Sequence, residues 1–127
     1  MISKNKVALF GAAVGAAAVL AGPAQSQGFD FKGKQIKLTI GFGFGGTYGK
    51  YSRMFAEHLK RHIPGTPNII VESRPGAGGL LATNYAAKAM PANGLNYLVP
   101  PDSSVVVQLM RPKKAKFDMS KFSWIGS

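Results

Sequence analysis

Two glycine-rich stretches have residue types and spacings suited to binding an anion. In the first, Gly41, Gly43 and Gly46 form G-x-G-x-x-G, the spacing with which a dinucleotide-binding turn approaches a pyrophosphate. The second, Ser73–Gly79, has the sequence S-R-P-G-A-G-G. Glycine-rich turns that lead into helices present free backbone N–H groups at the positive end of the helix dipole. Both stretches therefore predict recognition of an anion by the backbone, and the pattern alone does not say which anion.

The elements around these glycines are predicted to alternate between strand and helix, because a period of two in the apolar residues gives way to steps of three and four. In chain order they are strand Gln35–Ile40, helix Thr47–His62, strand Asn68–Val71, helix Leu80–Met90, strand Tyr97–Val99 and helix Ser103–Met110. This order predicts an α/β fold, with a mainly parallel sheet and flanking helices. Ligands of such sheets bind outside the carboxyl ends of the strands. We therefore expect both glycine-rich stretches and Pro100–Ser104 to converge at that edge.

The helix predicted over Thr47–His62 has a charged face and a second face that we expect to pack against the sheet. The side chains of the second face are Tyr51, Met54, Phe55, His58, Leu59 and His62. His58 and His62 are four residues apart, a spacing that can bind zinc. No third ligand is nearby and the H-E-x-x-H order is absent. We expect these histidines to be partly buried packing residues, and the chain to bind no metal.

The glycines have a structural explanation beside the functional one, since glycine also permits positive φ in tight turns. Two such stretches at one sheet edge favour a role in binding an anion.

A dinucleotide site stays open as the alternative, because Glu72 ends the second strand, where an acidic residue would meet a ribose. A phosphate loop is disfavoured, because Phe44 and Tyr51 occupy positions that need glycine and the hydroxyl of serine or threonine. No Ser, His and acidic residues are placed as a hydrolase requires, so we expect a protein that is not an enzyme and uses no cofactor.

The first 26 residues have the layout of a signal peptide. Lys4 and Lys6 precede the uncharged run Val7–Ala21, and Ala24-Gln25-Ser26 offers a small-residue cleavage site. The apolar run is shorter than the roughly 20 residues that span a bilayer. We therefore expect residues 1–26 to direct export to the periplasm, and residues 27–127 to form one small domain.

The composition of that domain limits how it can be stabilised and which classes of partner it can bind. The chain has no cysteine, so packing rather than disulfides must stabilise it. Its formal net charge of +11 becomes +9 without Lys4 and Lys6. Such a balance can indicate a nucleic-acid binder, but an exported protein with dispersed charges is better suited to attracting small anions. We expect no nucleic-acid partner, and a monomer.

Several motifs between Lys34 and Ser127 occur together in one family. The most specific is R-P-G-A-G-G at Arg74–Gly79, followed by Phe42 with Gly45-Gly46, A-K-A-x-P-x-x-G at Ala87–Gly94, and the ending F-x-W-I-G-S. With these motifs the chain resembles the substrate-binding receptors of tripartite tricarboxylate transporters, the Bug family of periplasmic proteins. Phe122–Ser127 also has the composition of a strand that is just beginning. We therefore expect residues 27–127 to be an incomplete N-terminal lobe.

The resemblance implies the N-terminal lobe of a type II periplasmic binding protein, which closes over a small organic acid and delivers it to membrane transporter subunits. In the family, two glycine loops bind one carboxylate through backbone amides. By position, the ligand-binding residues would be Phe42, Gly45, Gly46 and Thr47, then Ala77, Gly78 and Gly79, and more loosely Ser103 and Ser104. This chain departs from the family at Gly41, Gly43 and Phe44, where prolines are common, and at Gly49, where Asp is frequent. The resemblance therefore predicts a carboxylate without specifying which one.

Overall fold

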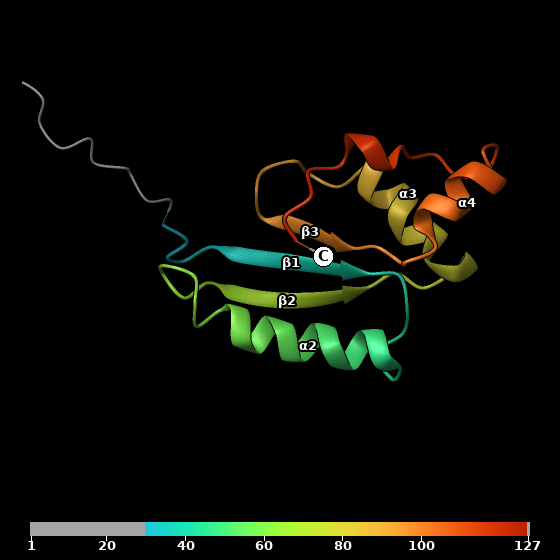
Figure 1. Cartoon of the computed structure of the whole chain (residues 1–127). Helices are drawn as coiled ribbons and strands as arrows, with labels where there is room; N and C mark the ends of the chain where they lie inside the picture. The colour runs from blue at the N-terminus through green and yellow to red at the C-terminus, as the bar shows by residue number, and fades with distance from the viewer. Residues whose placement is uncertain (1–29, 127) are drawn as a thin grey trace, which may run out of the picture.

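A three-stranded parallel sheet forms the centre of the protein (Figure 1). The computed structural model describes residues 30–126, so the predicted signal peptide lies outside the described residues. The strands are β1 (Gln35–Ile40), β2 (Asn68–Ser73) and β3 (Asn96–Val99), in the order β2-β1-β3. Both neighbours pair with β1 in parallel. The predicted α/β class with a parallel sheet is confirmed.

Helices lie on both sides of this sheet. The helix α2 (Thr47–Leu59) packs against β1 and β2, and α3 (Leu80–Lys88) packs against β3. Figure 1 shows α2 on one side, with α3 and α4 (Ser104–Met110) on the other. Two short 3₁₀ turns, η2 (Ala77–Gly79) and η3 (Met119–Lys121), complete the described elements. No helix within residues 30–126 is long and apolar enough to cross a membrane.

The buried residues explain why β1 is central. Ile36, Leu38 and Ile40 alternate with Lys37 and Thr39, as a strand requires. Thr39 is also buried, because helices cover both faces of the sheet. A second apolar cluster lies under α3 and α4 and consists of Leu80, Ala115, Phe117 and Met119, with Val107 and Phe122 packed against it.

Polar side chains attach the segment after α4 to the helices. The Asn84 side chain of α3 donates to the Lys114 carbonyl oxygen at 3.1 Å and accepts from the Lys116 N–H at 2.6 Å. Gln108 of α4 accepts from the Met119 N–H at 2.9 Å. These bonds hold the segment against α3 and bring Phe117 and Met119 into the core.

The predicted packing face of α2 is wrong. The buried residues of this helix are Gly49, Ser52 and Ala56, whereas the large side chains Tyr51, Met54 and Phe55 are each more than half exposed. Small residues recur at the same three- and four-residue steps and allow the helix to approach the sheet closely. His58 and His62 are likewise exposed, so they are not the packing residues we expected.

The end of the described chain also differs from its prediction. Phe122–Gly126 forms no strand. Instead the Trp124 Nε1–H donates to the Met119 carbonyl oxygen at 3.3 Å, which turns the segment back onto η3. Among the described residues β3 pairs only with β1, so this segment has no strand partner there. The other differences are at element ends: α2 stops at Leu59 and α3 at Lys88, whereas β2 extends to Ser73 and β3 begins at Asn96.

Candidate functional site

Three loops meet at the carboxyl edge of the sheet, as predicted. We call Gly41–Gly46 the first loop, Arg74–Gly79 the second loop and Pro100–Ser103 the third loop; they follow β1, β2 and β3 respectively. The first and second loops touch at their backbones, because a Cβ placed on Gly41 would lie 2.7 Å from Gly79 Cα. A Cβ on Gly79 would in turn overlap the Pro101 ring of the third loop.

The first turn of α2, which follows the first loop directly, is connected to the third loop by a hydrogen bond. Tyr48, in the first turn of α2, donates its hydroxyl to Asp102 Oδ1 at 3.0 Å. Burial, followed by this hydrogen bond, raises the pKa of Tyr48 above its ordinary value of 10.0, which extends the pH range over which the phenol is protonated and donates. Each loop therefore contacts the other two, directly or through Tyr48.

The first loop leaves the start of α2 open. A Cβ on Gly43 or Gly45 would meet nothing within 4 Å, and on Gly46 only the Gly43 oxygen at 4.0 Å. Gly46 precedes the helix in an extended conformation, without a side-chain cap, and the first turn carries no acidic residue. Within residues 30–126, no hydrogen bond from the N–H groups of Gly45 or Thr47 is found, whereas the turn at Phe44-Gly45 directs the Gly46 N–H toward the Gly43 carbonyl without a short hydrogen bond. These exposed donors lie at the positive end of the helix dipole, where an anion is stabilised.

Contacts on the far side of the first loop hold it in this conformation. The Ser73 hydroxyl donates to the Phe42 carbonyl oxygen at 2.8 Å, and Arg53 donates to the Phe44 carbonyl oxygen at 3.1 Å. The Phe42 ring stacks on Tyr48, with 4.4 Å between ring centroids. Gly49 has no room for a side chain, because a Cβ there would overlap the Phe44 backbone. The first loop therefore packs directly on α2 at Gly49.

The second loop is folded on itself. Gly76, Ala77, Gly78 and Gly79 all have positive φ, between 50° and 141°. The Gly79 N–H donates to the Gly76 oxygen at 3.0 Å, and Gly79 is buried. Ala77 and Gly78 are exposed, and no bond from their N–H groups is found in the described part of the chain. Of the three predicted residues in this loop, Ala77 and Gly78 thus offer accessible donors, whereas the Gly79 amide is already used within the loop.

Arg74 anchors the second loop, a role that sequence analysis did not assign. Its N–H donates to the Ile40 oxygen of β1 at 2.9 Å. Its guanidinium pairs with Glu72 at 3.1 Å and lies over the Tyr85 ring of α3, 3.7 Å from the centroid. The Nε atom is buried with no partner among the described residues. Glu72, the residue expected to meet a ribose in the dinucleotide alternative, is thus occupied by Arg74.

The third loop brings hydroxyl groups beside the second. Ser103 is exposed and Ser104 is buried. Gly78, Ser103 and Ser104 line the same small hollow, together with Thr83. The predicted residues of the second and third loops are therefore neighbours. Asp102 was missed by sequence analysis, because its bond to Tyr48 joins positions 54 residues apart.

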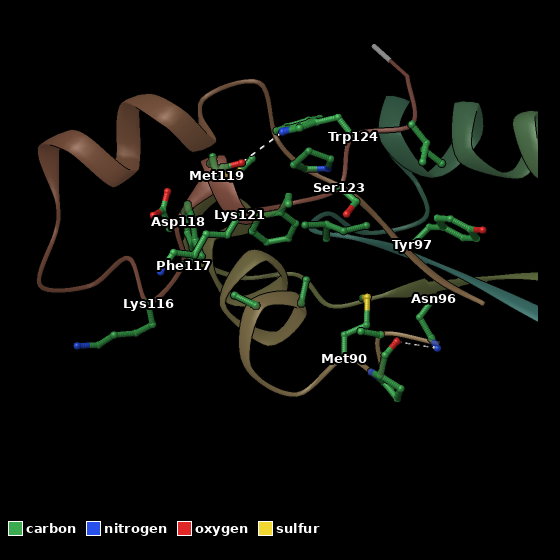
Figure 2. A pocket seen from close by; sticks show the side chains of 18 of the residues that line it. Met90, Asn96, Tyr97, Lys116, Phe117, Asp118, Met119, Lys121, Ser123 and Trp124 are labelled. Atoms are coloured by element: carbon green, nitrogen blue, oxygen red, sulfur yellow. Dashed lines mark hydrogen bonds between the residues drawn. The ribbon is translucent and has the colours of Figure 1, made fainter. Parts of the chain in front are cut away.

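A hollow of about 870 Å³ lies elsewhere in the described structure (Figure 2). Its walls come from the end of α3, from β3 and from residues 115–126, and include Met90, Tyr97, Phe117 and Trp124. None of the predicted ligand-binding residues line it. It is largely apolar and lacks the free backbone donors of a helix N-terminus, so we take the loop edge as the candidate anion site. Within residues 30–126, no three His, Cys, Asp or Glu side chains are grouped as a metal site would require.

Comparisons with known proteins agree with the resemblance at a coarser level. No family model matches the chain. It is 37% identical over 90 residues to the UPF0065 protein of the gbd 5′ region of Cupriavidus necator, an alignment that covers 71% of this chain and 26% of that protein. The chain is similar to UPF0065 proteins. A second, from Bordetella bronchiseptica, is 28% identical over 88 residues, covering 69% of this chain and 25% of that protein. The chain thus spans about a quarter of the length of the curated relatives that it matches.

Proposed function

We propose that this chain binds the carboxylate group of a small organic acid at the meeting point of the first and second loops. The observation that carries the proposal is the uncapped start of α2, where the N–H groups of Gly45, Gly46 and Thr47 are exposed beside the second loop. Ala77 and Gly78 supply further donors from that loop, and Ser103 adds a hydroxyl. Phe42 contributes its ring, stacked on Tyr48, as an apolar wall.

The size of the interactions supports weak but specific binding. Hydrogen bonds to a charged group contribute about 1.5–3 kcal/mol each. The helix dipole adds about 0.3–1 kcal/mol at an exposed N-terminus. Two such bonds and the dipole together give about 3–7 kcal/mol, close to the lower estimates of about 4 kcal/mol for the cost of association, so binding by this chain should be weak. Fourteen Lys and Arg side chains against five acidic ones within residues 30–126 raise the local concentration of anions.

The biological role we propose is that of a periplasmic solute receptor that delivers the acid to a tripartite tricarboxylate-type transporter. This rests on the predicted signal peptide, on the motif resemblance, and on the similarity to UPF0065 proteins. The relatives are about four times longer than the matched region, and we propose that in such a protein a second lobe covers the far end of the acid. The transporter subunits would be its protein partners, with no catalysis and no cofactor.

The test is an NMR titration of the full chain, labelled with ¹⁵N, with acetate, succinate and citrate. We expect saturable shifts of the amide signals of Gly45, Gly46, Thr47, Ala77 and Gly78. Gly33 and Gly94 precede strands at the opposite edge of the sheet and serve as internal controls. If no carboxylate shifts the loop signals and a nicotinamide dinucleotide does, the carboxylate proposal is wrong and the dinucleotide alternative replaces it.

A further inference from the structure

Asp102 differs from the other acidic residues in what it contacts. Asp30, Glu57, Glu72 and Asp118 each contact a partner two or three residues away in the sequence. The Asp102 carboxylate instead reaches a partner 54 residues away, the hydroxyl of Tyr48. Among residues 30–126 no cation lies within ion-pair distance of it. Its negative charge is therefore not neutralised by a neighbouring side chain.

The position of Asp102 places this charge at the candidate site. The residue follows Pro101, which packs against Gly79 of the second loop. Its carboxylate is bonded to Tyr48, which is next to Thr47 at the open start of α2. Asp102 thus follows the residue that packs on the second loop and is bonded to the residue that follows Thr47. A carboxylate has about four acceptor positions, of which Tyr48 uses one, so the exposed side chain retains acceptors for a ligand.

We propose that Asp102 is a specificity-determining residue, which selects small acids that carry a hydrogen-bond donor, an ammonium or a hydroxyl group, and disfavours dicarboxylates. This inference rests on the proposed function, because the ligand's carboxylate must occupy the loop amides. A donor on the same ligand then pairs with Asp102, whereas a second carboxylate is placed beside a like charge. Tyr48 acts as the positioning residue, since its hydroxyl orients the Asp102 carboxylate and its ring is fixed by stacking on Phe42.

The ligands for the test differ in a single group. Propionate, glycolate, glycine and malonate are acetate carrying a methyl, hydroxyl, ammonium or carboxylate group, and butyrate, 3-hydroxypropionate, β-alanine and succinate repeat the set with one more carbon. Dissociation constants come from the loop amide shifts of the full chain. In each set, we expect the tighter-binding of the two donor-bearing acids to bind about tenfold more tightly than the dicarboxylate of the same length. A tenfold difference is the effect expected of one charge-assisted contact. Comparison of the ammonium and hydroxyl acids identifies the preferred donor.

Two variants distinguish an effect of Asp102 on ligand selection from an effect on folding of the chain. Asp102→Asn keeps the shape and removes the charge, so we expect dicarboxylates to bind at least as well as donor-bearing acids. Glu57→Gln removes one negative charge from the far half of α2 and should leave the order of affinities unchanged. An unchanged order in Asp102→Asn, or an equal loss for all ligands, refutes the specificity role while leaving the carboxylate site intact. Absence of binding by every acid in the native chain overturns both proposals.

Discussion

The first and second loops have similar glycine content and precede helices on opposite sides of the sheet, yet their glycines serve different purposes. In the second loop, Gly76, Gly78 and Gly79 have positive φ, and Gly79 also lies against the Pro101 ring. In the first loop, Gly43, Gly45 and Gly46 have no positive φ, and no side chain would overlap them. The backbone of the second loop therefore requires glycine, whereas in the first loop only Gly41, which lies against the Gly79 backbone, is required by packing, and Gly43, Gly45 and Gly46 are not.

The same contrast applies to the N–H groups at the two helix starts. Before α3, the second loop uses its own carbonyl groups, since Gly76 accepts from both Gly79 and Leu81. Before α2, the donors are left exposed. A glycine that neither conformation nor packing requires, next to unused donors, is best explained by a ligand that must approach the backbone. We therefore propose the first loop as the main anion-binding element, with the second loop as its support, offering two accessible amides.

The sharpest test of this contrast is Gly79→Ala in the second loop. Alanine is strained at a φ of 88°, and its Cβ overlaps Pro101. We expect a loss of about 3 kcal/mol in the free energy of unfolding, measured by urea denaturation, from left-handed strain and overpacking together. Gly33→Ala is the matched control, because Gly33 has a φ of 71° but open surroundings, and should lose only about 1 kcal/mol. Equal losses would mean that contact with the third loop does not matter.

In the first loop, by contrast, a glycine substitution should weaken ligand binding and leave the stability of the chain almost unchanged. Gly45→Ala adds a Cβ to open space, so the free energy of unfolding should change by less than about 0.5 kcal/mol. Binding of acetate or glycolate should weaken about tenfold, because the methyl group hinders approach to the helix donors and one charge-assisted bond is lost. Amide shifts measure the binding, and urea denaturation measures the stability. A destabilised variant with unchanged binding would assign this loop the structural role that we give to the second.

Local pattern was sufficient to predict much of the fold and the edge of the sheet at which the three loops meet. Alternating residues such as Ile36, Leu38 and Ile40 predicted β1, and parallel strands bring their carboxyl ends to one edge whatever the loops contain. The buried face of α2 could not be predicted this way, because Gly49, Ser52 and Ala56 have the same helical spacing as the larger residues. Only the tertiary contact shows that the small face packs.

Within the candidate site, the sequence predicted which residues are present but not whether their N–H groups are free or already hydrogen-bonded. Gly45 and Gly79 looked equivalent as glycines before helices, and only the backbone conformation shows that one N–H is free and the other is bonded to Gly76. Tyr48 and Asp102 carry no motif, and their pairing depends on the docking of α2 beside the third loop. Long-range contacts of this kind are outside what periodicity can predict.

The smallest expected effect concerns how each glycine loop is attached to the third loop. The second loop is attached by packing of Gly79 on Pro101, which does not titrate, whereas the first is attached through the Tyr48–Asp102 hydrogen bond.

The pKa of Tyr48 is raised in the folded chain, so the contribution of this bond is fully present below pH 10 and is lost as the pH rises through the raised value. Above it, a phenolate would face the Asp102 carboxylate, and the first loop should loosen while the second stays in place. Phenolate absorbance should show a late-titrating component that Tyr48→Phe removes and that Tyr51→Phe, a substitution at an exposed position, leaves in place. Carbon-detected spectra should then show Gly45 changing with that titration and Gly78 not changing. Simultaneous changes in both loops would mean that they move as one unit, and that their difference is confined to the use of glycine.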